Sequence, residues 1–160
     1  FEEFSANGLQ RSQGFIGYVN EHPSMELVDL RYVVSNREAP YQATIEMLEA
    51  SPEINAIATF NEWTSLGVAQ AIDEMGLAEQ IAVVAFDNNE ESVQMRERGV
   101  IDDLMVQKPC AMGDVGVEQA LALLGGKQPE EWNIFTETVP ITVENMFTPQ
   151  NQKLLFPFSQ

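Results

Sequence analysis

Polar side chains stand directly after several short apolar runs of this sequence. Asn36 follows residues 33–34, Asn61 follows 58–60, Asp87 follows 84–86, and Gln107 follows 104–106. Amide and carboxylate groups each make two directed hydrogen bonds to neighbouring hydroxyls, whereas an anionic ligand calls for several basic groups or an unoccupied helix N-terminus. The four residues therefore favour a small, neutral, polyhydroxylated ligand.

Each of these residues also has an ordinary structural explanation. Asn and Asp after a strand are frequent helix N-caps, and Asn61 stands directly before a helical pattern. Trp63 is either a ring that stacks on the apolar face of a sugar or a core residue of an amphipathic helix, and the core is the commoner place for it. The pattern leaves both alternatives open.

Alternating strands and helices must position these side chains. Apolar spacing predicts helices over 11–22, 40–50, 62–75, 90–99 and 109–124, and short apolar runs predict strands over 27–34, 56–60, 81–86, 104–107 and 138–143. Residues 147–160 show no clear period and are assigned no element. Such alternation favours parallel pairing through right-handed crossovers, so the predicted class is α/β, a doubly wound parallel sheet with helices on both faces. Ligands of such sheets bind beyond the carboxyl ends of the strands, where these residues stand.

The composition excludes several kinds of partner. The chain carries 25 acidic and 8 basic residues, a formal charge of −17, which repels phosphate backbones, so no nucleic-acid partner is expected. Cys110 is the one cysteine and His22 the one histidine, too few for a zinc or iron–sulfur site.

The sequence also does not match the motifs that would indicate metal binding, phosphate binding or nucleophilic catalysis. The acidic run 87–91 resembles a calcium loop, but Ser92 stands where the loop needs glycine and Arg98 where it needs a bidentate glutamate. Gly125 and Gly126 follow a helix instead of preceding one, so they form no phosphate loop, and no Gly-x-Ser-x-Gly elbow is present. We therefore expect no catalytic residue, metal or cofactor, and a protein that is not an enzyme.

Four segments taken together resemble one family. They read Arg11-Ser-Gln-Gly-Phe15, Ile57-Ala-Thr-Phe-Asn61-Glu-Trp-Thr-Ser-Leu-Gly67, Val83-Val-Ala-Phe-Asp87, and Val106-Gln107-Lys-Pro109 with Met112-Gly113. In this order and spacing, from Arg11 to Asn145, the chain resembles the periplasmic sugar-binding proteins of ABC importers, of the ribose- and galactose-binding type. Proteins of that family have two α/β lobes joined by three crossing strands.

The resemblance implies a division of the chain. Residues 1–107 would form the C-terminal lobe, 108–138 would return to an N-terminal lobe that is otherwise largely missing, and 139–160 would form the last crossing strand and a tail. It also implies export to the periplasm or the cell exterior, lipid-anchored or secreted.

The resemblance further implies a function and its residues. By motif position, Arg11, Asn61, Asp87 and Gln107 match the family's contacts to sugar hydroxyls, and Asn36 is added from its place after a strand. The chain would bind a monosaccharide by hinge closure of two lobes and deliver it to the membrane component of an ABC transporter. Departures from the family pattern leave the sugar open: Ser35 stands where many members carry a stacking aromatic residue, Glu62 replaces an aspartate, and Ala85 replaces a glycine.

The alternative is a ligand-sensing domain of a LacI-type transcriptional regulator or of a membrane-linked sensor, because these proteins use the same fold. Regulators usually show Pro-Leu-Thr-Thr where this chain reads Gly99-Val-Ile-Asp-Asp-Leu-Met105, and Val143-Glu-Asn145 is more similar to transport proteins. Fold alone does not decide between them.

Overall fold

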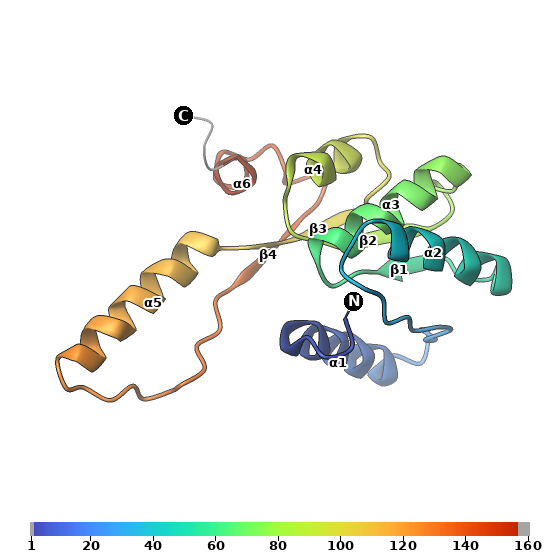
Figure 1. Cartoon of the computed structure of the whole chain (residues 1–160). Coiled ribbons are helices and arrows are strands. Elements are labelled where there is room, and N and C mark those ends of the chain that lie inside the picture. Colours follow the sequence, from blue (N-terminus) through green and yellow to red (C-terminus); the bar gives the residue numbers. More distant parts are fainter. Residues whose placement is uncertain (1, 157–160) are drawn as a thin grey trace.

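The computed structural model describes residues 2–156 (Figure 1). In chain order its elements are α1 (Ala6–Glu21), α2 (Glu38–Ala50), β1 (Ala56–Ala58), α3 (Glu62–Met75), β2 (Ala82–Phe86), α4 (Glu90–Glu97), β3 (Asp103–Gln107), α5 (Pro109–Leu124), β4 (Thr138–Ile141) and α6 (Pro149–Leu155). Every predicted helix is present. The predicted strands from residue 56 onward are also present: β1, β2 and β4 are shorter than predicted, and β3 begins one residue earlier.

The strands form one sheet in the order β1-β2-β3-β4. The first three pair in parallel, with Ile57 opposite Val83 and Ala85 opposite Leu104. The last strand, β4, runs antiparallel to β3. Figure 1 shows α3 and α4 on one side of the sheet and α1 on the other. The predicted α/β class is confirmed, with an antiparallel strand at the β4 edge.

The core lies between α3 and the two central strands. Ile72 of α3, Val83 of β2 and Leu104 of β3 are fully buried, together with Ile141 of β4. Helix α3 has well-defined ends: Asn61 caps its start, and Gly76 ends it with φ +67°, a left-handed conformation that glycine adopts without steric cost. Because β1, β2 and β3 pair in parallel, their carboxyl ends lie at one edge of the sheet.

The strand predicted over residues 27–34 is wrong, because this segment pairs with no strand in the described chain. An apolar hollow of about 670 Å³ lies between it and β1. The Asp29 carboxylate accepts hydrogen bonds from the Leu30 N–H and from Arg31 Nε, both at 2.7 Å. Local side-chain bonds of this kind compete with the ladder bonds of a sheet. Val34, at the end of the segment, is 64% exposed.

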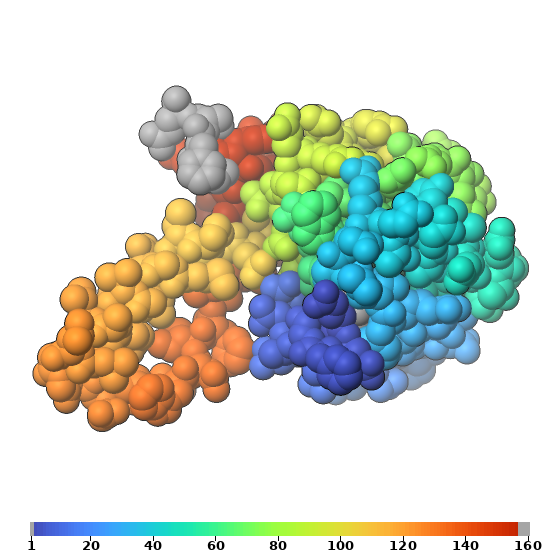
Figure 2. All heavy atoms as spheres, in the orientation of Figure 1, coloured from blue at the N-terminus to red at the C-terminus, as the bar shows by residue number. Residues whose placement is uncertain are grey.

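Helix α5 and the segment after it project from the rest of the molecule, as Figures 1 and 2 show. None of the residues of α5 is buried. Large apolar side chains are exposed along it and beyond it, among them Val117, Leu121, Leu124, Trp132 and Phe135. The periodicity that predicts this helix is real, but the described chain does not cover its apolar face. Within residues 2–156, no helix is both long and apolar enough to span a membrane.

Helix α6 lies in the stretch to which the sequence pattern assigned nothing. Thr148 caps it through a hydrogen bond from the Asn151 N–H, and Pro149 occupies the first turn, where its fixed φ suits a helix. Leu155 at its end is 3% exposed and belongs to the core. The Thr-Pro pair was the available signal for this helix, and its seven residues are too few for a clear period.

Candidate ligand-binding site

Asp87 stands at the carboxyl end of β2 in an unusual backbone conformation. Its φ is +70°, and it is the one non-glycine residue between 2 and 156 with a positive φ. Its backbone N–H donates to the Met105 carbonyl at 3.1 Å, which ties it to β3. Backbone conformations of this kind persist where the surrounding structure holds them, and they cluster at functional sites. Asp87 is therefore a strong candidate for a functional carboxylate.

Three of the predicted residues meet through side-chain hydrogen bonds. Gln107 at the end of β3 donates from Nε2 to Asp87 Oδ1 at 2.5 Å, and its Oε1 accepts from Arg11 Nη2 at 3.0 Å. Arg11, on α1, also donates from Nη1 to the Phe60 carbonyl at 2.8 Å. Its guanidinium lies 4.3 Å from the centroid of the Phe86 ring, a cation–π distance. We call Arg11, Gln107 and Asp87 the polar triad.

The polar triad joins one cation to one anion through a neutral amide. All three residues are partly buried, so each keeps some exposure to solvent. The charges balance, and planar groups offer paired donors and acceptors at fixed angles. This arrangement suits a neutral ligand with adjacent hydroxyl groups.

Asn61 and Asn36 both accept hydrogen bonds at helix starts, as the capping explanation predicts. Asn61 Oδ1 accepts from the Thr64 N–H at 2.9 Å, which caps α3, while its Nδ2 donates to Ser35 Oγ at 3.1 Å. Asn36 is exposed, and its Oδ1 accepts from the Ala39 N–H at 2.8 Å in the first turn of α2. Neither residue bonds to the polar triad in the described chain, and their ligand contacts stay predictions.

Trp63 is not part of the core. It stands in the first turn of α3 and is 50% exposed. Its burial among apolar residues, the commoner alternative, is therefore wrong. Stacking on a ligand stays an open role for this ring.

Three further residues contribute to this edge, and sequence reasoning gave none of them a bonding role. Ser35 links two loops, because its hydroxyl accepts from Asn61 and its N–H donates to Glu2 Oε1 at 3.2 Å. Phe60 supplies the carbonyl that Arg11 binds, and Phe86 supplies the ring beneath the guanidinium. Phe60 and Phe86 each directly precede a predicted contact residue, and that adjacency was the only signal for them.

Replacing Asn61 with alanine is expected to lower the free energy of unfolding by about 1 kcal/mol, because the Thr64 N–H loses its side-chain cap. Asn61→Asp is the matched control, since aspartate also caps a helix start. Urea denaturation followed by circular dichroism measures both variants. Equal stability of the two would show that the cap contributes nothing.

The two segments that lead to and from α5 are joined by an ion pair. Lys108, just after β3, donates from Nζ to Glu137 Oε2 at 2.5 Å, just before β4. The hydrogen bond from Lys108, and then its positive charge, hold the pKa of Glu137 below its usual value. Because the folded-state pKa is lowered, the pair contributes stability at neutral pH and loses it as the pH falls through that pKa. The pair lies at the surface, so its contribution is small.

Replacing Lys108 with methionine is expected to raise the pKa of Glu137 towards that of an ordinary glutamate, because the donor and the charge are both removed. Titration of the Glu137 side-chain carboxyl by NMR measures the shift, and Glu144 serves as a reference. The pKa of Glu144 is lowered chiefly by the Thr142 hydroxyl, so it should not move. A Glu137 titration unchanged by the substitution would contradict the pairing.

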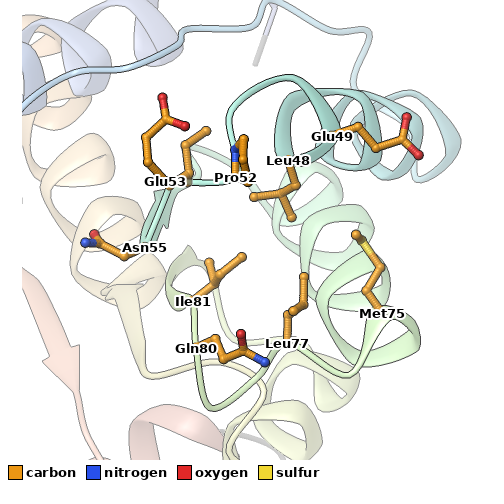
Figure 3. Close-up of a pocket in the computed structure, with 10 residues that line it drawn as sticks. Leu48, Glu49, Pro52, Glu53, Asn55, Met75, Leu77, Gln80 and Ile81 are labelled. Atoms are coloured by element: carbon orange, nitrogen blue, oxygen red, sulfur yellow. The ribbon is translucent and has the colours of Figure 1, made fainter.

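A second hollow, of about 390 Å³, lies at the other end of the sheet (Figure 3). Asn55 stands just before β1 and Ile81 just before β2, so this hollow is at the amino ends of the strands. In Figure 3 the side chains of Leu48, Leu77 and Ile81 point toward one another. It is therefore separate from the polar triad. Residues 2–156 hold no cluster of three or more His, Cys, Asp or Glu side chains arranged for a metal ion.

Known proteins resemble this chain in sequence. The model of the periplasmic binding protein domain matches residues 2–128. A D-ribose/D-allose-binding protein of Pseudomonas aeruginosa is 28% identical over 126 residues, which are 79% of this chain and 39% of that protein. The D-allose-binding periplasmic protein of Escherichia coli is 26% identical over 114 residues, 71% of this chain and 37% of that protein. The chain thus spans well under half of the length of these relatives.

Solved structures give the same picture. A carbohydrate transporter solute-binding protein of Agrobacterium radiobacter, in complex with D-arabinose, superposes with a TM-score of 0.84 at 29% identity, over 92% of this chain and 50% of that one. An ABC transporter solute-binding protein of Agrobacterium vitis with bound D-fucose gives a TM-score of 0.83 at 27% identity, again over 92% and 50%. The architecture therefore matches about half of a larger protein.

Proposed function

Because the chain belongs to the periplasmic binding protein family, we propose that it forms one wall of a site for a neutral monosaccharide, in the solute-binding component of an ABC importer. The observation that carries the proposal is the polar triad at the carboxyl edge of β2 and β3. Arg11 and Asp87 are held by Gln107 with their charges balanced, ready to bind vicinal hydroxyls from fixed directions.

The chemistry of the site supports a neutral solute over an anionic one. A phosphate brings net negative charge. A matched cation and anion linked through an amide offer neither a surplus of charge nor a free helix start. Asn61, which follows the neighbouring strand β1, donates from Nδ2 to Ser35 Oγ at 3.1 Å. The two residues add an amide and a hydroxyl to the same edge. The similar proteins bind D-ribose or D-allose, D-arabinose and D-fucose, all neutral monosaccharides.

The second wall of the site belongs to another lobe in this proposal. Helix α5 and residues 125–137 leave the C-terminal lobe after Gln107 and return at β4, and their apolar side chains are exposed. A packed first lobe would cover Val117, Leu121 and Trp132. The β3–α5 and β4 segments, tied by Lys108 and Glu137, then form hinge strands. Ligand bridging both lobes favours the closed state, which the membrane component of the transporter recognises.

The proposal assigns binding without chemistry and a place outside the cytoplasmic membrane, in the periplasm or at the cell surface. Within the polar triad, Gln107 holds both charged groups in place, and a binding site needs side chains that are fixed in this way.

A thermal-shift screen of the two-lobed protein tests the proposal. The panel contains D-ribose, D-allose, D-arabinose, D-fucose, neutral polyols and, as controls, charged amino acids. A sugar present at a hundred times its dissociation constant is expected to add about 2.7 kcal/mol of stability. A response to amino acids with silence across sugars would overturn the substrate class. Uptake of the responding sugar by vesicles carrying the transporter then separates an importer component from a regulator or sensor.

A further inference from the structure

Three consecutive side chains after β2 bind three different elements. Asp87 accepts from Gln107 of β3, and Asn89 caps α4 by accepting from the Ser92 N–H at 2.8 Å. Between them, Asn88 Nδ2 donates to the carbonyls of Leu154 at 3.0 Å and Leu155 at 3.2 Å, both at the end of α6. The contact with α6 spans 66 residues of sequence. It joins the polar triad to the C-terminal segment.

The carbonyls that Asn88 binds are fixed by the packing of α6. Leu155 is 3% exposed within the core cluster, and Leu154 packs against that cluster. Asn151 Nδ2 donates to the Asn145 carbonyl at 3.0 Å, and Gln152 Nε2 donates to the Met146 carbonyl at 2.8 Å. The last carbonyls of a helix have no partner inside the helix, so they need a donor from elsewhere. Asn88 supplies that donor.

Asp87 needs such support because its backbone is in the left-handed region. For a non-glycine residue that conformation costs of order 1–3 kcal/mol and lasts where its neighbours hold it. The bond from its own N–H to Met105 fixes one side of the residue. The residue on the other side is Asn88, which is fixed to α6.

We propose that Asn88 is a positioning residue for ligand binding: by bonding to the end of α6 it holds Asp87 in the left-handed conformation that aims its carboxylate at Gln107 and at the ligand. The C-terminal segment 142–156 thereby sets ligand affinity without touching the ligand. This inference rests on the proposed function of the polar triad.

Asn88→Ala in the two-lobed protein tests this role, with Gln94→Ala as the matched control. The control loses an exposed side-chain hydrogen bond to Glu90 within α4, which touches neither α6 nor Asn88. Isothermal titration with whichever of D-ribose, D-allose, D-arabinose and D-fucose binds the wild type is expected to show a loss of about tenfold for Asn88→Ala. The control should stay within about twofold. Equal losses in the two variants would reduce Asn88 to a structural contact and overturn the proposal.

A double-mutant cycle separates positioning from general destabilisation. If Asn88 acts through Asp87, the loss caused by Asn88→Ala should shrink in an Asp87→Asn background, whose carboxylate is already gone. The same loss in both backgrounds would contradict the proposal.

A measurement without ligand keeps the inference independent of the sugar. Amide hydrogen exchange at Asp87, whose N–H is bonded to Met105, should be faster in Asn88→Ala than in wild type, while the Val83 amide in the core should not change. If exchange is faster but the wild type binds no sugar, the support of Asp87 by Asn88 stands and the proposed function fails. If exchange is unchanged, Asn88 does not hold Asp87, and the inference fails whatever the sugar screen shows.

Discussion

Replacing Asp87 with alanine or with glycine is expected to weaken sugar binding in the two-lobed protein by roughly 2–5 kcal/mol. Both substitutions remove the carboxylate that accepts from Gln107, and they leave the Arg11 charge without its counterpart. The two variants should nevertheless differ in stability. At φ +70° alanine is strained and glycine is not, so Asp87→Gly should be more stable than Asp87→Ala by about 1 kcal/mol.

Calorimetric titration and urea denaturation of the same samples check both halves of this expectation. Asp87→Asn is the informative third variant, because asparagine also tolerates the left-handed region while lacking the charge. Its stability should follow glycine and its affinity should follow alanine. Wild-type affinity in the alanine variant would remove Asp87 from the site, and equal stability of the alanine and glycine variants would show that the backbone there is not strained.

Replacing Gly67 with valine is expected to destabilise the protein by about 3 kcal/mol or more, and alanine by about 1–3 kcal/mol. A Cβ atom on Gly67 of α3 would lie 2.5 Å from the Arg37 carbonyl and 2.5 Å from Pro40 Cγ, at the start of α2. The carbonyl is backbone and cannot turn aside, so α2 must move. That movement displaces Ser35, the partner of Asn61, and sugar affinity should fall with stability.

Gly17→Ala is the matched control, because Gly17 lies inside α1 with nothing within 4 Å of a Cβ atom placed there. Alanine at an open helical position should raise stability by up to about 1 kcal/mol. The denaturation midpoints of Gly67→Val, Gly67→Ala and Gly17→Ala measure these changes in stability. A Gly67→Ala variant that gained stability like Gly17→Ala would mean that α2 and α3 do not pack this closely.

The amino-acid sequence determined the class of the fold and the edge at which to look for the ligand. Helical period, Gly76 as a stop and Asn61 as a cap are local properties, readable within one or two turns, and they located α3 to the residue. The apolar runs located β2 and β3, and hence Asp87 and Gln107 at their ends. Only the resemblance to the sugar-binding family predicted that Arg11 lies beside them, because no local sequence pattern indicates it.

Tertiary structure decided the features that depend on distant residues. The bond from Arg11 to Gln107 joins positions 96 apart, and the bond from Asn88 to α6 joins positions 66 apart. The left-handed Asp87 and the close approach at Gly67 exist because neighbouring elements hold them, and no pattern of polar and apolar residues encodes either. Residues 27–34 have the composition of a strand, but a strand forms only where a partner edge is within hydrogen-bonding reach. Local sequence supplied the elements, and long-range contacts selected which of them meet.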